Sequence, residues 1–179
     1  MTFFLNRARL RWASWTAVLG LAACAQTYGP GDETPAVTFS HQSFPRELAR
    51  YEAPLFDLVR PEGRRYDAQL ARQLRALLAS QLRTEGHYVE RLTSGPAPAA
   101  SYYVVGRRGY VYFSACQAHD CDASTLDVLF DPTDRRLVGK LQDKGILQWV
   151  GGPDERESVL LDHLRRVSSR DLDRGCGRC

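Results

Sequence analysis

The stretch YYVVGRRGYVYFSA, residues 102–115, decides the fold class of this 179-residue chain. It holds two runs of aromatic and β-branched residues, Tyr102–Val105 and Tyr110–Ala115, on either side of Gly106-Arg107-Arg108-Gly109. Two such runs around a short glycine-containing connection predict an antiparallel β-hairpin. The two arginines of the connection could suggest phosphate binding, but a solvated turn explains them better.

Three more strands are predicted after this hairpin. Apolar runs lie at Leu126–Phe130, Arg136–Leu141 and Ile146–Val150. The first two flank Asp131-Pro132-Thr133-Asp134, where proline presets φ and aspartate bonds the local backbone, as turns require. Consecutive short strands with a turn signal after each indicate an antiparallel meander.

Helical patterns flank the strands. We expect helices over Glu47–Val59 and Asp67–Arg83, the second because its leucines form one apolar stripe that ends at Gly86. A last helix begins at Asp154, with Glu157 placed for a capping box, and a polar tail follows over residues 166–179. Helices followed by consecutive strands predict a single α+β domain, with an antiparallel sheet of about five strands and flanking helices. The expected core-facing helical residues are Leu70, Leu74, Leu77, Leu78, Leu82, Val159, Leu160 and Leu164.

The charge of the chain is concentrated at its N-terminus. There are 24 Lys and Arg against 21 Asp and Glu, a formal net charge of +3. Residues 1–23 contain Arg7, Arg9 and Arg11 and no acidic residue, so residues 24–179 are balanced at 21 of each sign. A nucleic-acid binder carries its basic surplus in the folded domain. We therefore predict no nucleic-acid partner.

The basic N-terminus has the features of an export signal. An uncharged apolar stretch, Trp12–Ala23, follows the arginines and is too short for an ordinary membrane-spanning helix. It ends in Leu21-Ala22-Ala23-Cys24, which resembles a bacterial lipobox in which Cys24 is lipidated. Ordinary cleavage at Ala23-Cys24-Ala25 is the alternative, and either route exports the chain.

Residues 1–23 are therefore predicted to be a signal peptide of the lipoprotein type, and residues 24–45 a flexible tether rich in Gly, Pro, Thr and Ser. By resemblance to enterobacterial sorting, Ala25 after the cysteine favours the outer membrane. We expect a periplasmic protein that touches the membrane only through its lipid anchor.

The remaining cysteines are Cys116, Cys121, Cys176 and Cys179, and disulfides are the default in an oxidising compartment. The segment CQAHDC, residues 116–121, has three interpretations: a disulfide-closed loop, a zinc site, or a catalytic Cys–His pair. A closed ring would present His119 and Asp120 on a rigid tip. At the C-terminus, Cys176-Gly177-Arg178-Cys179 could be a redox motif, a local disulfide or a link to another chain.

The segment Cys116–Cys121 resembles the Cys-Lys-Pro-His-Asp-Cys loop of the inhibitor of vertebrate lysozyme (Ivy-type) family. Ser114-Ala115 precedes it as in that family, and Leu55-Phe56-Asp57-Leu58 is similar to the family's first helix. Tyr88-Val89 and Leu147-Gln148-Trp149 fall in compatible order, so the resemblance covers residues 46–165. Gln117 and Ala118 depart from the family's Lys and Pro.

The resemblance implies a proteinaceous inhibitor of c-type lysozyme, with no enzymatic activity and no cofactor or metal. In the family this loop, here Cys116, Gln117, Ala118, His119, Asp120 and Cys121, enters the active-site cleft and its histidine meets the two catalytic carboxylates. The expected role is protection of the cell wall against host lysozyme. The alternative is an envelope lipoprotein that controls endogenous lytic transglycosylases, and a homodimer is left open.

A run of acidic residues surrounds the loop. Residues 114–134 contain no Lys or Arg. Animal lysozymes of this class are generally basic, so we expect an acidic binding face that steers the encounter. Its members would be Asp120, Asp122, Asp127, Asp131 and Asp134.

Overall fold

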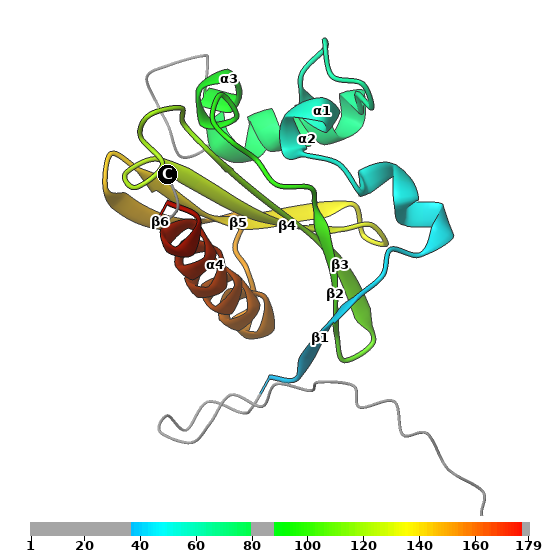
Figure 1. The fold of residues 1–179 in the computed structure, drawn as a ribbon. Helices are drawn as coiled ribbons and strands as arrows, with labels where there is room; N and C mark the ends of the chain where they lie inside the picture. The colour runs from blue at the N-terminus through cyan, green and yellow to red at the C-terminus, as the bar shows by residue number, and fades with distance from the viewer. Residues whose placement is uncertain (1–36, 80–87, 177–179) are drawn as a thin grey trace, which may run out of the picture.

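The computed structural model describes residues 37–79 and 88–176, and it has the predicted α+β architecture. Six antiparallel strands form one sheet in the order β1-β2-β3-β4-β5-β6, so the meander is confirmed with one strand more than expected. The helices α1, α2 and α3 cover one face of the sheet, and α4 covers the other (Figure 1). The strands are β1 Phe39–Gln42, β2 Ser101–Val105, β3 Arg108–Cys116, β4 Thr125–Asp131, β5 Arg136–Asp143 and β6 Ile146–Val150.

The additional strand, β1, lies in the segment expected to be part of the tether. It pairs antiparallel with β2, from Phe39 opposite Val105 to Gln42 opposite Tyr102. Phe39 is buried beside the α4 layer, and this anchors a strand whose other residues are polar. The expected tether therefore does not include residues 39–42. The signal peptide, Cys24 and residues 24–36 lie outside the described residues.

The first predicted helix is interrupted. A 3-10 helix, η1, covers Arg46–Tyr51, and a separate helix, α1, covers Leu55–Val59. Pro54 between them has no N–H to donate, and a proline also disfavours the helical conformation of the preceding Ala53. The prediction of one helix over residues 47–59 was wrong at this position.

The leucine stripe forms the helix α2, Ala68–Ala79, with Leu70, Leu74 and Leu78 buried against the sheet. Asp67 caps its N-terminus, since one carboxylate oxygen accepts the backbone N–H of Gln69 and of Leu70, both at 3.0 Å. Burial raises the pKa of Asp67, but these hydrogen bonds and the charge of Arg50 outweigh burial and lower it below its usual value. The expected helix end at Gly86 lies outside the described residues. A short helix that was not predicted, α3, follows at Tyr88–Leu92.

The last helix, α4, covers Glu155–Cys176 and begins with the predicted capping box. The N–H of Glu157 donates to Asp154 Oδ1 at 2.9 Å, and the N–H of Asp154 donates to Glu157 Oε2 at 2.8 Å. A polar tail was expected from residue 166, but the helix continues, because no Gly or Pro occurs between residues 155 and 174. Leu160, Leu161 and Leu164 are buried against the sheet.

Polar side chains also join α4 to the sheet. Asp127 of β4 is 1% exposed and faces the helix. It accepts the Tyr112 hydroxyl at 2.7 Å and pairs with Arg165 at 3.3 Å. Burial raises the pKa of Asp127, although both partners favour its charged form. No helix within the described ranges is both long and apolar enough to cross a membrane.

Candidate functional site

The CQAHDC segment connects β3 to β4 and is closed by a disulfide. Cys116, the last residue of β3, is bonded to Cys121 with an S–S distance of 2.02 Å and a Cα–Cα distance of 4.9 Å. The zinc site and the catalytic Cys–His pair both require free thiolates, so the disulfide overturns these two interpretations. Within the described part of the chain, no group of three His, Cys, Asp or Glu residues could hold a metal ion. Cys179 lies outside that part, so its pairing with Cys176 stays a prediction.

The loop is also held by its own hydrogen bonds. The Gln117 N–H donates across the base of the loop to the Ser124 carbonyl at 3.0 Å, and the Ser124 N–H donates to the Asp120 carbonyl at 2.8 Å. The Ser124 hydroxyl donates to Asp120 Oδ2 at 2.7 Å. Asp120 therefore belongs to the internal framework of the loop as well as to its tip.

His119 lies at the tip and is exposed to solvent. Its φ of 64° is in the left-handed region, which histidine adopts more readily than most residues with a Cβ. No neighbouring residue of the loop turns its backbone this way, because the positive φ values outside glycine occur in the described chain only at His119, Arg135 and Lys144. The disulfide-closed ring therefore presents an exposed imidazole at a sharp turn of the backbone.

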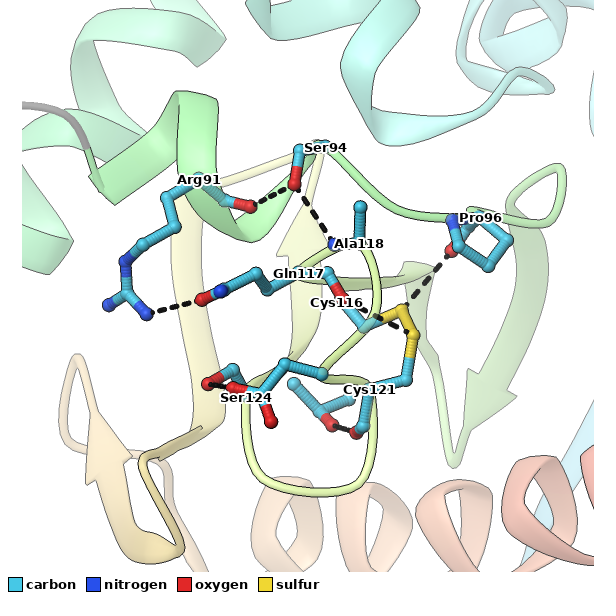
Figure 2. Close-up of a disulfide and its surroundings, with 10 residues drawn as sticks. Arg91, Ser94, Pro96, Cys116, Gln117, Ala118, Cys121 and Ser124 are labelled. Carbon is cyan, nitrogen blue, oxygen red and sulfur yellow. Dashed lines mark hydrogen bonds between the residues drawn. A yellow bond between two sulfur atoms is a disulfide. The ribbon is translucent and has the colours of Figure 1, made fainter.

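The segment that follows α3 lies against the start of the loop and bonds to it (Figure 2). The Gly95 N–H donates to the Cys116 carbonyl at 2.9 Å, and the Ala118 N–H donates to the Ser94 hydroxyl at 3.0 Å. A Cβ at Gly95 would lie 2.7 Å from the Cys116 carbonyl oxygen, so only glycine permits this close approach. Sequence reasoning missed this support; its only local signal was a glycine in the Pro- and Ala-rich connection.

Arg91 of α3 joins the loop to the next hairpin. Its Nη1 donates to Gln117 Oε1 at 2.7 Å, and its Nη2 pairs with Asp143 at the end of β5, also at 2.7 Å. Gln117 thus accepts a hydrogen bond that a lysine at this position could not accept. Where the family loop has a lysine, this chain has Gln117, and Arg91 is the donor that bonds to it.

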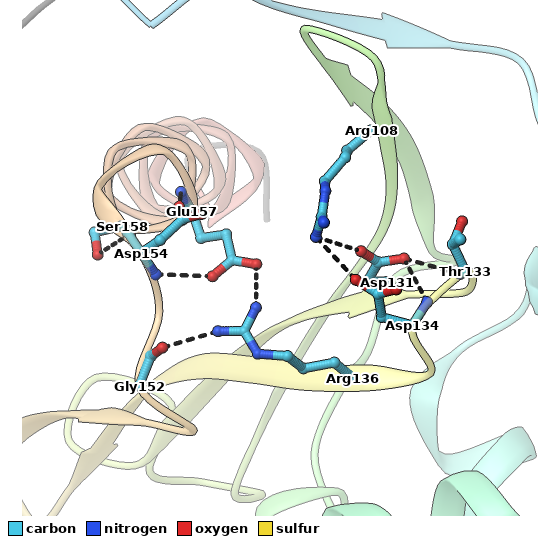
Figure 3. Close-up of polar contacts among 9 residues, drawn as sticks. All are labelled: Arg108, Asp131, Thr133, Asp134, Arg136, Gly152, Asp154, Glu157 and Ser158. Carbon is cyan, nitrogen blue, oxygen red and sulfur yellow. Dashed lines mark hydrogen bonds and ion pairs between the residues drawn. The ribbon is translucent and has the colours of Figure 1, made fainter.

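The expected acidic face does not form. Asp131 and Asp134 lie at the opposite end of β4 from the loop, and both pair with Arg108, at 3.3 and 3.0 Å (Figure 3). Seven strand residues separate the two ends by roughly 20 Å. Asp127 is buried under α4, so only Asp120 and Asp122 of the run accompany the loop. Arg108 makes both contacts from the β2–β3 turn, and its side chain is still 60% exposed, as the prediction of a solvated turn requires.

The described residues thus present a pre-formed polar loop on a rigid α+β scaffold. A loop whose shape is fixed before binding loses little conformational entropy when a partner takes it up. This arrangement is typical of proteins that bind a partner through a constrained loop.

A family model described as Inhibitor of vertebrate lysozyme (Ivy) matches residues 69–160, just over half of the chain, and the chain belongs to this family. The matched range contains the whole disulfide loop and lies inside the range that the resemblance covered. No curated protein matches the chain, and no solved structure does. Membership implies lysozyme inhibition in general, with a lysozyme as the partner.

Proposed function

We propose that this protein is an exported inhibitor of c-type lysozyme that inserts the Cys116–Cys121 loop into the active-site cleft. The observation that carries the proposal is His119, which is exposed at the tip of a loop held by a disulfide and by bonds on both sides. Family membership supplies the class of target.

The chemistry of the target suits an imidazole. A retaining glycosidase holds its two catalytic carboxyl groups about 5 Å apart. An imidazole has one nitrogen on each side of its ring, so it can reach both carboxyl groups while it occupies the sugar site. His119 supplies such an imidazole. The hydrogen bond between the Ser124 hydroxyl and Asp120 Oδ2 holds the backbone next to His119 in place.

The location of the protein is part of the proposal. A disulfide in the loop agrees with an oxidising compartment such as the periplasm. We propose that the lipobox cysteine, Cys24, anchors the chain in the outer membrane, where the inhibitor would protect the cell wall. Replacement of Cys24 by Ala should release the protein from membrane fractions and abolish labelling with palmitate.

Inhibition of c-, g- and i-type lysozymes by the purified protein, measured side by side on a peptidoglycan substrate, tests the function. We expect inhibition of the c-type enzyme. His119→Ala should raise the inhibition constant by at least about 100-fold, which corresponds to roughly 2.7 kcal/mol. Asparagine also tolerates the left-handed backbone conformation of His119. A loss of inhibition in His119→Asn would therefore be caused by the missing imidazole and not by a strained loop.

The matched control is His41→Ala, since His41 is an exposed histidine on β1, at the far edge of the sheet. Full inhibition by His119→Ala would refute the assigned role of the imidazole. Failure of the unaltered protein to inhibit any of the three lysozymes would refute the function and favour control of lytic transglycosylases.

A further inference from the structure

Exposed apolar side chains gather on one strand of the sheet. Ile146, Leu147 and Trp149 of β6 are 70%, 51% and 40% exposed. Among residues 37–79 and 88–167, whose side chains the structure describes, only two other large apolar residues are exposed, Tyr66 and Val167, and they lie apart from β6 in the chain. Such a cluster on an edge strand is a liability for aggregation unless a partner covers it.

The meander places this strand beside the loop. Thr125 at the start of β4 pairs with Gln142, and Asp143 at the end of β5 pairs with Ile146. The β3–β4 loop and the β5–β6 turn therefore lie at the same end of the sheet (Figure 1).

Direct hydrogen bonds join the loop and the turn. The Gly145 N–H donates to the Ala123 carbonyl at 2.9 Å, and Gln142 Nε2 donates to the Asp122 carbonyl at 3.0 Å. Arg91 adds a third connection, because it contacts the loop through Gln117 and the hairpin through Asp143. The loop and the hairpin therefore form one continuous surface of fixed geometry.

The apolar side chains lie on both faces of the edge strand. Leu147 and Trp149 are two residues apart and share one face of the sheet. Ile146, one residue before Leu147, projects toward the opposite face. Trp149 is held in place by Lys140, whose Nζ lies 4.8 Å from the ring centroid, and Lys140 is itself paired with Asp162 of α4. β6 is the last strand of the sheet, so a partner can approach its outer edge.

The size of the loop requires additional contacts. Four residues lie between the two cysteines, whereas a stable protein–protein interface uses about 20–30 residues on each side. Interface energy is concentrated in large aromatic and apolar anchors near the centre of the contact. On this side of the loop, β6 offers anchors of that kind.

We propose that Ile146, Leu147 and Trp149 form a second contact surface for the lysozyme that receives the loop, and that they pack against apolar side chains at the rim of its cleft. This inference rests on the proposed function. It assigns blocking of the catalytic groups and the largest share of the affinity to His119, and an additional share of the affinity to β6.

The test measures binding of the purified full chain to c-type lysozyme by calorimetry, together with inhibition. The double variant Ile146→Ser/Leu147→Ser should weaken binding by at least about tenfold, because two anchors are lost while the disulfide loop is unchanged. Tyr66→Ser is the matched control, since Tyr66 is 40% exposed in the segment between α1 and α2. Its dissociation constant should stay within about twofold of the unaltered chain, as for a residue outside the interface.

Hydrogen exchange of the complex gives a second readout. The backbone amides of residues 146–150 should become protected when lysozyme binds, together with those of the loop. Unchanged affinity of the double variant, with binding lost in His119→Ala, would overturn this inference and leave the proposed function intact. Absence of lysozyme binding by the unaltered chain would overturn both.

Discussion

Replacement of both loop cysteines by serine tests how the loop keeps its shape. The disulfide joins residues five positions apart, and the chain-entropy relation for so short a ring gives about 2 kcal/mol of stabilisation. We expect Cys116→Ser/Cys121→Ser to lower the free energy of unfolding by about this amount, which a domain of ordinary stability survives.

The effect on inhibition should be smaller than the effect on stability. If the reduced loop were fully mobile, ordering it on binding would cost the whole 2 kcal/mol, or roughly a 30-fold rise in the inhibition constant. The bonds from Gln117, Gly95 and Ser124 still hold the loop, so we expect a rise of about three- to tenfold.

Urea unfolding followed by circular dichroism measures the stability, and lysis of a peptidoglycan substrate measures the inhibition. Cys176→Ser/Cys179→Ser is the control for removing two cysteines that do not belong to the loop disulfide. A rise in the inhibition constant as large as that of His119→Ala, with only a small loss of stability, would refute the view that hydrogen bonds preserve the loop. An unchanged midpoint in urea would refute the entropic estimate.

Three further predictions concern the scaffold. Gly95→Ala should cost about 1–3 kcal/mol in urea unfolding and also weaken inhibition, because its Cβ would press on the Cys116 carbonyl 2.7 Å away; unchanged inhibition would show that the support is dispensable. Glu157→Ala should cost about 2 kcal/mol without changing inhibition, since it removes a buried cap and the partner of Arg136 at 2.6 Å, and a loss under about 0.5 kcal/mol would contradict this (Figure 3). The pKa of Asp67 is lowered on folding from 3.8, so its ionised form stabilises the protein above about pH 4, and this contribution is lost as pH falls through the folded pKa. Asp67→Asn should therefore flatten the acid limb of a stability–pH curve, and an identical limb would contradict the argument.

Local patterns were sufficient for much of the architecture. Alternating aromatic and β-branched residues predicted the hairpin of β2 and β3, and the leucine stripe predicted α2. The capping box at Asp154 and Glu157 was also readable, because both partners lie within one helical turn. In each case the residues that interact are close in sequence.

Two of the errors, on β1 and on the acidic run, arose where distant residues decide the outcome. β1 is a strand because Phe39 reaches a core built by α4 and because β2 offers an edge to pair with. The predicted acidic face does not form because Asp131 lies at the end of β4 far from the loop and Asp127 is buried under α4. Neither fact is visible from the spacing of aspartates.

Local sequence patterns predicted the α+β class, five of the six strands of the meander and the loop that contains His119. The neighbours of that loop became visible only in the three-dimensional fold: Gly95 and Arg91 contact it, and the exposed edge of β6 lies beside it. Local periodicity determines which segments become strands or helices, because it sets which side chains share a face. Which segments then meet depends on pairing register and close packing across the chain, and these contacts make the loop rigid and give it neighbours.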